Sequence, residues 1–546
     1  MSEVDFIRVW ARRMAIALAM AGTSAVAWLH AAAPINLTTA DLGRHIQNGA
    51  QFFLHHQILS TNFYSYTHPE TWAPCHHWGI GPLFYGIWKA WDFSGLSFFY
   101  AGLLTLTFWL CVWSARRASS FSAALLMGLL ALPLIGYRSE IRPEGVSTFF
   151  IAIYYVLLSE YRMRRLSGKW LWVLPVLQMF WVNIHILFFC GLVILGIFVV
   201  DAFLYPKDRQ PPRDMLMVLI ASAAACMIGP FGLTGFLAPL FIFKAYGYKL
   251  AENQNVLFMI KRFPGRSIYE YTLVVFGMGA VLVGLRLWNK RLRDGGFIAL
   301  VLFVFFGFLA LKAVRMIGTF GFLFIPLGAE GLYSLGKYGA GRYEKVFHRC
   351  VTALAALMLL GALTVPYFYL SPVRKFQQTM IAENPAYQNS IFQILVRPHV
   401  WGGLASGVNG AAEFFKSQGM KGPIFNNYDI GGYLIFHLFP GERPFVDNRP
   451  EAYPVTFFSQ VYAPMQTDEV FWHDMVRKEG FQVIFFYRHD MTDWGQPFLI
   501  RRLADPQWAP VYVDGYSLIL ARRGGVNQKV IDQYELPKDI FKITHP

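Results

Sequence analysis

The chain has 546 residues, of which 55% are hydrophobic, 17% aromatic and only 15% charged. Soluble globular proteins carry about a quarter charged residues, so this composition excludes an ordinary soluble fold for most of the chain. The formal net charge of +15 does not indicate nucleic-acid binding, because much of the basic charge sits in short clusters between apolar runs. No arginine-rich helix, zinc-finger spacing or RNA-binding aromatic signature is present.

Apolar runs of spanning or nearly spanning length fill residues 14–370, which predicts a polytopic α-helical membrane protein of about eleven helices. The first run follows Arg8, Arg12 and Arg13 and exceeds the ~7–15-residue core of a signal peptide, which favours an uncleaved span. Several runs are shorter than the ~20 residues of a straight span, so their ends are approximate. The expected spans are 14–33, 96–115, 121–137, 146–160, 170–184, 186–204, 215–230, 270–287, 295–312, 316–334 and 351–370.

Lysine and arginine cluster in every second loop of this scheme, which places those loops and the N-terminus in the cytoplasm. The C-terminal domain then lies on the periplasmic or extracellular side of the plasma (bacterial inner) membrane. Segment 79–91 is expected to be a juxtamembrane helix with Trp78, Trp88 and Trp91 at headgroup level; the alternative is a second span here. The clusters are Arg8/Arg12/Arg13, Arg116/Arg117, Arg162/Arg164/Arg165/Lys169, Lys207/Arg209/Arg213, Arg286/Lys290/Arg291/Arg293 and Lys337/Arg342/Lys345/Arg349.

The chain is expected to divide into a membrane domain, 1–370, with a long outer loop at 34–95, and a soluble α/β domain, 371–546. None of the five cysteines lies in the second domain, which therefore has no disulfide framework or CxxC zinc site. Strand-like runs at 423–426, 444–447, 483–487, 510–513 and 517–521 alternate there with helical stretches at 408–419 and 455–478.

Ionisable residues at membrane level are costly and mark functional sites by default, and here the good candidates lie on the outer side. Asp41 opens the first outer loop, which continues through His45 to His76-His77-Trp78. Lys312 and Arg315 are three residues apart and are expected on one helix face. The further candidates are Arg138, Arg142 and Glu144 after the third span and Asn183 and His185 after the fifth.

These elements resemble, in their order and shared sidedness, the GT-C superfamily of lipid-linked-sugar glycosyltransferases. That superfamily includes protein O-mannosyltransferases, aminoarabinose transferases and oligosaccharyltransferase catalytic subunits. The resemblance rests on Asp41, on His77-Trp78 before a juxtamembrane helix and on Arg142-Pro143-Glu144 entering a span, and it covers roughly residues 10–335. It implies inverting transfer of a sugar from a polyprenyl-phosphate lipid to a glycan, lipid or protein acceptor at the outer membrane face. No cofactor is expected, with a divalent metal as the alternative.

The resemblance makes Asp41 the base that takes the acceptor proton, and desolvation at an apolar boundary raises the basicity of a carboxylate. Lys312 and Arg315 would neutralise the departing phosphate, with Arg138 and Arg142 as second candidates. Many relatives have a second acidic residue beside the catalytic one, whereas Leu42 follows Asp41 here. The substrate-binding residues would be His45, His77, Glu144, Asn183 and His185.

Each candidate also has a plainer structural interpretation. Asp41 could cap a helix, Lys312 and Arg315 could be snorkelling side chains, and Arg142 with Glu144 could be a local ion pair. Histidines of the first loop could hold a divalent metal with Asp41, but their spacing fits no standard zinc pattern, so no metal is predicted. These histidines are His45, His55, His56, His68, His76 and His77.

In the C-terminal domain, the segments 425–433 and 446–453 are unusually rich in polar residues and glycine. Gly431 and Gly432 are expected to form a tight turn, because no phosphate-loop spacing surrounds them. Asp447, Arg449 and Glu451 alternate in an extended run and would share one face. They would either bind the acceptor or glycan, or form a buried salt-bridge cluster that fixes the domain.

Two other functions stay open. The single carboxylate of the first loop is compatible with a catalytically silent relative that acts as a scaffold or assembly subunit of a membrane complex. A transporter or lipid flippase is disfavoured because Asp and Glu are nearly absent from the spans, with Asp201 as the exception.

The topology can be tested directly with fused reporters. A reporter active only outside the cytoplasm should give signal when fused after Arg522 and none when fused after Arg349, because the basic cluster before Arg349 is held inside. The reverse pattern would overturn the whole orientation.

Overall fold

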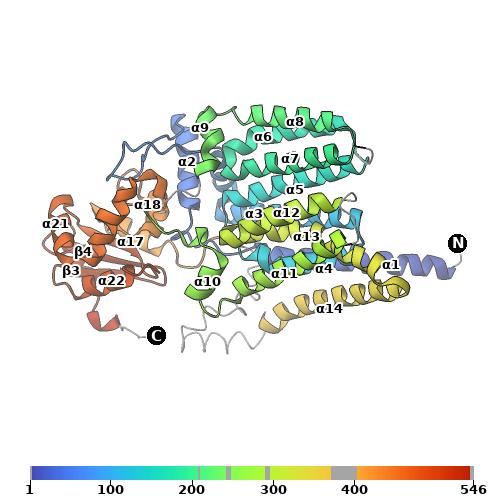
Figure 1. Cartoon of the computed structure of the whole chain (residues 1–546). Coiled ribbons are helices and arrows are strands. Elements are labelled where there is room, and N and C mark those ends of the chain that lie inside the picture. The colour runs from blue at the N-terminus through green and yellow to red at the C-terminus, as the bar shows by residue number, and fades with distance from the viewer. Residues whose placement is uncertain (1–2, 207–209, 242–246, 289–294, 371–401, 542–546) are drawn as a thin grey trace. The chain divides into compact units, whose positions relative to one another are not determined.

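The computed structural model describes residues 3–206, 210–241, 247–288, 295–370 and 402–541 (Figure 1). The chain forms two compact units. Unit 1 consists of Met1–Ala33, Ser97–Pro239 and Leu250–Gly402. Unit 2 consists of Pro34–Leu96, Leu240–Lys249 and Gly403–Pro546, so the first long outer segment folds together with the C-terminal part of the chain. The expected boundary at residue 370 stays a prediction, since 371–401 lie outside the described residues.

Helices make up most of unit 1, and each expected span overlaps one of them. Six candidate spans among the described residues are long and apolar enough to cross a membrane, in keeping with an integral membrane protein, while the count of eleven stays a prediction. The basic residues Lys207, Arg209, Lys290, Arg291 and Arg293 lie outside the described part. The larger helices are α1 (Glu3–Ala31), α3 (Ile80–Ala118), α4 (Phe121–Gly136), α5 (Pro143–Arg162), α6 (Val173–Ile184), α7 (Phe189–Leu204), α8 (Pro212–Ala225), α11 (Ser267–Trp288), α12 (Phe297–Lys312), α13 (Ile317–Ser334) and α14 (Glu344–Leu370).

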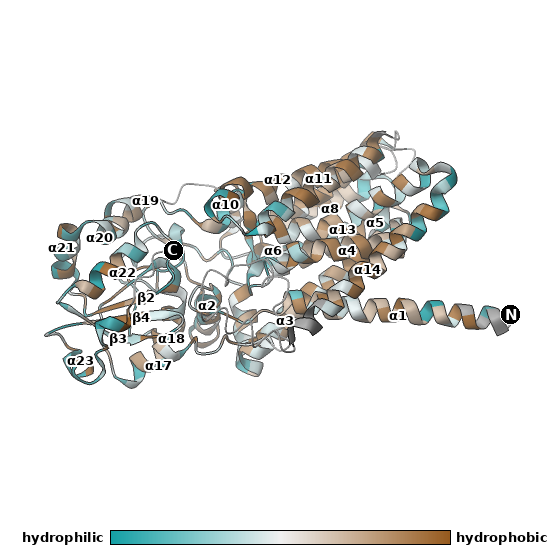
Figure 2. Cartoon of the chain, turned by 90° about the horizontal axis from the view of Figure 1, so that it is seen from below, coloured by the Kyte–Doolittle hydropathy of each residue, from teal (hydrophilic) through white to brown (hydrophobic). Residues whose placement is uncertain are grey.

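Helix α13 is the centre of unit 1. Nearly all of its side chains between Ile317 and Gly331 are buried, and it packs against α4, α11 and α12. These helices are rich in apolar residues, and the hydrophobic colour therefore dominates them in Figure 2. A second group, α5 to α8, runs side by side (Figure 1). Two short helices, α9 (Gly232–Leu237) and α10 (Val256–Arg262), follow α8.

Helix α3 contains a break near its first third. Trp91 (φ −140°) and Asp92 (φ 56°) have non-helical dihedral angles, so the residues before them form a separate helix. This agrees with the short helix expected at 79–91. Trp91 is 70% exposed, which is compatible with a side chain that contacts lipid headgroups. The position of this helix at a membrane surface stays a prediction.

Unit 2 is built on a four-stranded sheet of order β1-β2-β4-β3, with β1 and β2 parallel and the other pairs antiparallel. Consecutive residues of a strand point to opposite faces, and β2 shows this with Phe485 and Phe486. Phe485 packs on Phe415 of α17 (Gly410–Ser417), whereas Phe486 packs on Phe498 of α22 (Gly495–Ala504). Helices therefore cover both faces, which confirms a small α/β fold. The strands are β1 (Ile424–Asn426), β2 (Val483–Tyr487), β3 (Trp508–Val513) and β4 (Ser517–Arg522).

The expected strand at 444–447 is wrong, and a single side chain explains why. The Asn426 carboxamide accepts a hydrogen bond from the Phe445 amide at 2.8 Å and donates one to the Val446 carbonyl at 2.7 Å. A buried side chain thus satisfies backbone groups that a neighbouring strand would otherwise bind. The helices of unit 2 are α2 (Leu42–His55), α17 (Gly410–Ser417), α18 (Gly431–Leu438), α19 (Val455–Phe457), α20 (Ala463–Thr467), α21 (Glu469–Glu479), α22 (Gly495–Ala504) and α23 (Gln528–Tyr534).

The expected helix at 455–478 is interrupted rather than continuous. Asp468 leaves the helical region (φ −117°, ψ 116°), and its carboxylate accepts hydrogen bonds from the amides of Val470 and Phe471. Asp468 is therefore the N-cap that starts α21, a role that favours aspartate at this position.

Candidate functional site

Three arginines and three glutamates of unit 1 form one charged group, here called the arginine–glutamate cluster. Arg138 follows α4, and Arg142 is the residue before α5, with Pro143 in the first position of that helix. Proline fits there because the first helical amide has no partner within the helix. The cluster consists of Arg138, Arg142, Arg315, Glu140, Glu144 and Glu252.

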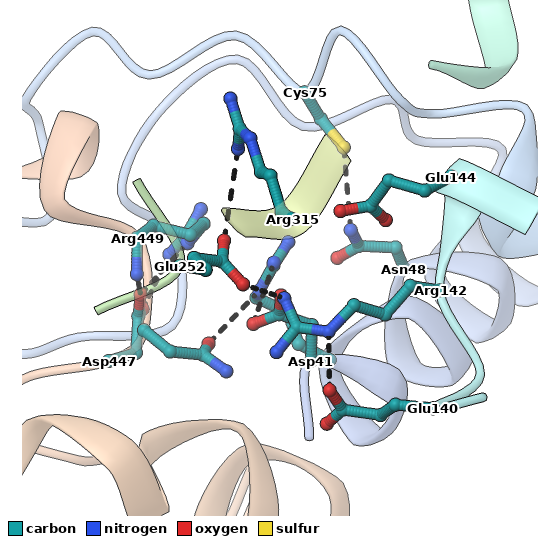
Figure 3. Close-up of polar contacts among 12 residues, drawn as sticks. Asp41, Asn48, Cys75, Glu140, Arg142, Glu144, Glu252, Arg315, Asp447 and Arg449 are labelled. Carbon is teal, nitrogen blue, oxygen red and sulfur yellow. Dashed lines mark hydrogen bonds and ion pairs between the residues drawn. The ribbon is translucent and has the colours of Figure 1, made fainter. Parts of the chain in front are cut away.

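Glu252 lies at the centre of this cluster (Figure 3). Its Oε2 accepts hydrogen bonds from Arg138 Nη2 at 2.7 Å and from Arg142 Nη1 at 2.8 Å. Its Oε1 lies 3.8 Å from Arg315 Nη1, an ion-pair distance that is too long for a hydrogen bond. One carboxylate therefore faces three guanidinium groups.

The other two glutamates each pair with one arginine. Glu144 Oε1 is 3.3 Å from Arg138 Nη2, and Glu140 Oε2 accepts a hydrogen bond from Arg142 Nε at 2.8 Å. The side chain of Glu140 is 36% exposed, against 12% for Glu144 and 22% for Glu252. The three positive charges are thus matched by three negative ones, in surroundings that are mostly shielded from water.

The electrostatics of Glu252 follow from this arrangement. Burial alone raises the pKa of the carboxyl group, because it disfavours the charged form, but Arg142, Arg138 and Arg315 outweigh burial and hold the pKa well below its ordinary value of 4.5. Glu252 is therefore ionised at neutral pH. The sequence interpretation missed it, although an acidic residue in an outer segment between two predicted spans is a usable signal.

Lys312 and Arg315 do not share a helix face, so that expectation is wrong. α12 ends at Lys312, Ala313 is extended (φ −140°, ψ 113°), and Arg315 lies in the separate 3-10 turn Val314–Met316. Lys312 is exposed, and its Nζ lies 5.7 Å from the centre of the Phe308 ring. Because the helix ends before Ala313, Arg315 points toward Glu252 while Lys312 stays at the end of α12.

His185 and Asn183 make contacts that hold the end of α6. His185 is 5% exposed, and its Nδ1 lies 2.8 Å from Ser147 Oγ, which also accepts a hydrogen bond from Trp181 Nε1 at 2.9 Å. Asn183 Nδ2 donates to the carbonyl oxygens of Met179 and Ile228, both at 2.9 Å. These bonds fix the backbone, and substrate binding by either residue stays a prediction.

Asp41 belongs to unit 2 and occupies the N-cap position of α2. Its backbone is helical (φ −66°, ψ −12°), and its side chain makes no capping hydrogen bond, so the interpretation as a simple cap is wrong. The carboxylate instead lies 3.5 Å from Arg44 Nη2 and keeps a side-chain exposure of 21%. Arg44 Nε in turn donates to Asn448 Oδ1 at 3.3 Å.

Glycines allow two close approaches that hold α2 in place. A Cβ on Gly43 would lie 2.7 Å from the Gly432 carbonyl oxygen, and one on Gly49 would lie 2.2 Å from the Gly81 carbonyl oxygen. α2 is therefore packed backbone to backbone on α18 and on the start of α3, and any larger residue would push these helices apart. The expected tight turn at Gly431-Gly432 is wrong, since both residues lie inside α18.

Asp447 and Arg449 form a buried ion pair, whereas Glu451 lies in the turn that follows. Arg449 Nη2 lies 2.6 Å from Asp447 Oδ2 and donates to Asn62 Oδ1 at 2.8 Å. Glu451 is exposed and lies in the 3-10 turn Pro450–Ala452, so the shared extended face does not exist. For Asp447 and Arg449 the geometry favours a structural pair that ties the C-terminal part to the first outer segment.

The histidines of the first outer segment lie mostly on or beside α2. The rings of His45 and His77 stack at 6.5 Å, and His45 is 3% exposed. Across the described part of the chain, no three His, Cys, Asp or Glu side chains come together in a way that could hold a metal ion. Their binding of substrate stays a prediction.

Comparison with solved structures identifies the fold of this chain. No protein-family model and no curated protein matches the chain. The crystal structure of the Archaeoglobus fulgidus oligosaccharyltransferase tethered to an acceptor peptide matches with a TM-score of 0.56, 11% identity, 91% of this chain and 74% of that one. The same enzyme in complex with Zn and sulfate matches with a TM-score of 0.52, 11% identity, 92% of this chain and 73% of that one.

ArnT from Cupriavidus metallidurans in the apo state matches with a TM-score of 0.49 and 14% identity, over 94% of this chain and 98% of that one. The fold assignment rests on the two archaeal structures. The chain has a GT-C-like fold, as its sequence motifs indicated.

Removing the central carboxylate should destabilise unit 1. We expect Glu252→Gln to lower the free energy of unfolding by about 2 kcal/mol at pH 7, because charge-assisted hydrogen bonds are lost and arginines are left without their counter-ion. The folded-state pKa is depressed, so the stabilisation is present above the ordinary pKa of 4.5 and fades as pH falls below it.

Thermal unfolding of the full chain in detergent, measured from pH 7 downwards, checks this. The gap in Tm between wild type and Glu252→Gln should narrow below about pH 4.5. The exposed residue Glu270 provides the matched control, since Glu270→Gln should leave Tm unchanged throughout. A gap that stays constant with pH would contradict the electrostatic origin.

Proposed function

We propose that this protein is a glycosyltransferase that moves a sugar from a polyprenyl-phosphate donor to an acceptor at the outer face of the plasma membrane. The observation that carries the proposal is the convergence of three arginines on one anion position in a chain of GT-C-like fold. A fold alone does not define an activity, so the argument depends on what these side chains can do.

The donor half of the reaction needs a cationic site. When the bond between the sugar and the phosphate oxygen breaks, negative charge develops on the phosphate. Arginine matches phosphate oxygens with parallel donors, and Arg138, Arg142 and Arg315 already face one negatively charged group together. This supports binding of the departing lipid phosphate by the arginine–glutamate cluster.

The acceptor half needs a base. Asp41 is a partly exposed carboxylate held on α2, a helix that its glycine contacts keep in place. In a single inverting step the acceptor atom attacks the anomeric carbon, the sugar–phosphate bond breaks, and Asp41 takes the acceptor proton. The acceptor is a glycan, lipid or protein, and the positive-inside pattern supports an outer location for Asp41.

A catalytically silent scaffold subunit is the second candidate. It is favoured by Leu42, which stands where many relatives of the superfamily have another acidic residue beside the catalytic one. The two functions separate cleanly, because a scaffold transfers no sugar with any donor and does not depend on Asp41 for assembly.

The decisive variant is Asp41→Asn. It keeps the shape of the side chain but removes the proton acceptor, so sugar transfer should fall by roughly 10²–10⁴-fold while Tm barely shifts. Tm and transfer are measured on the same purified protein. Glu70→Gln, which changes an exposed carboxylate of the same outer segment, should leave both unchanged. Normal transfer by Asp41→Asn would exclude Asp41 as the base, and no transfer by the wild type would favour the scaffold.

The donor site is tested with Arg315 and Lys312, two nearby cations with different surroundings. Arg315→Ala should weaken binding of undecaprenyl phosphate in nanodiscs by about tenfold or more, since a hydrogen bond to a charged group contributes about 1.5–3 kcal/mol. Lys312→Ala should change it by less than about threefold, because an exposed charge contributes little. Equal effects of the two changes would contradict a phosphate site formed by the three arginines around Glu252.

A further inference from the structure

The arginine–glutamate cluster is electrically balanced, which raises a difficulty for any anionic ligand. Its three guanidinium groups face the carboxylates of Glu140, Glu144 and Glu252. A phosphate added to this set would bring a fourth anion into a site where charges are poorly screened. Binding therefore requires one carboxylate to give up its arginines.

Geometry distinguishes Glu252 from the other two carboxylates. Glu140 is at the edge of the cluster and contacts one arginine, and Glu144 is fixed in the first turn of α5 with a side chain only 12% exposed. Glu252 lies within ion-pair distance of all three arginines, whereas the ion pair of Glu144 is with Arg138 and its interaction with Arg142 and Arg315 is at longer range. It occupies the position where an anion would contact the largest number of donors.

A carboxylate does not use this position fully. One oxygen, Oε2, accepts hydrogen bonds from both Arg138 and Arg142. The other oxygen, Oε1, lies 3.8 Å from Arg315, which is too far for a hydrogen bond. A phosphate group has more oxygens in a tetrahedral arrangement and can offer a separate acceptor to each guanidinium group. The site is thus better matched to phosphate than to the side chain that fills it.

The surroundings of Glu252 allow an exchange through side-chain rotation. Glu252 lies in the short 3-10 turn Ala251–Asn253, and the backbone next to this turn is tied down by a bond from the Val314 amide to the Gln254 carbonyl at 3.0 Å. That bond holds Glu252 and Arg315 on connected backbone. The side chain of Glu252 is 22% exposed, so a carboxylate that rotates away from the arginines can meet water while its main chain stays in place.

We propose that Glu252 is a built-in counter-ion that occupies the phosphate position of the empty protein and is displaced when a phosphate group binds to Arg138, Arg142 and Arg315. This inference rests on the proposed donor site. Glu252 keeps the three arginines aligned in the absence of ligand. An anion binds only if its affinity for the arginines exceeds that of the Glu252 carboxylate, a condition that a phosphate group meets and a second carboxylate does not.

The test measures binding of undecaprenyl phosphate and of inorganic phosphate to the full chain in nanodiscs. Glu252→Gln removes the competing charge but keeps the shape, so it should bind the lipid phosphate about tenfold more tightly than wild type, a difference of about 1.4 kcal/mol. Glu140→Gln is the matched control: it removes the same charge from the edge of the cluster and should change affinity by less than about threefold. Inorganic phosphate binding as tightly as the lipid would identify a free anion as the ligand.

The outcomes separate this inference from the donor site itself. If wild type binds the lipid phosphate and Arg315→Ala does not, but Glu252→Gln binds equally or more weakly, the donor site stands and the exchange is refuted. If no variant binds either phosphate, both are refuted. Should Glu252→Gln fail to fold, Glu252→Asp replaces it, because the shortened carboxylate reaches the arginines less well and should also give tighter phosphate binding.

Discussion

The charged groups of unit 1 are governed by one constraint, that a charge shielded from water needs a partner of opposite sign. Arg138 and Arg142 lie in the connection between α4 and α5, Arg315 lies in the turn after α12, and Glu252 is the residue that holds them together. Without it, three like charges would face one another with little solvent between them. In the absence of a ligand, the position of each arginine depends on this one carboxylate.

A different constraint, close backbone contact, places the candidate base. α2 can lie this close to α18 and to the start of α3 because Gly43, Gly49 and Gly81 have no side chains. The helix that follows Asp41 is therefore fixed by packing rather than by its own cap. Asp41 forms an ion pair with Arg44, and its carboxylate remains partly exposed.

The sequence predicted the helical elements and the α/β nature of the C-terminal part, because long apolar runs and alternating strand and helix patterns are local signals, and its family resemblance indicated the GT-C-like fold. It failed where pairing is set by the tertiary structure. Glu252 was missed because Arg138 and Arg142, its hydrogen-bond partners, are more than a hundred positions away, so its place in the outer segment did not show which residues it pairs with. The strand expected at 444–447 does not form because the Asn426 side chain binds its backbone, and the helix face expected to carry Lys312 and Arg315 does not exist because Ala313 is extended. Each failure reflects a side chain or backbone group finding a partner that local propensity cannot anticipate.

The two charged sites also show why one is a candidate for ligand exchange and the other is not. Asp447 and Arg449 are two residues apart, completely or almost completely buried, and bound through several hydrogen bonds, so separating them would leave an uncompensated charge in the core of unit 2. Glu252 shares its two oxygens among three partners, with one of them beyond hydrogen-bond distance, and 22% of its side chain remains exposed. An ion pair that is buried and has its hydrogen bonds satisfied stabilises a fold. A carboxylate that is outnumbered by its arginines and still reaches water is a group that another anion can replace.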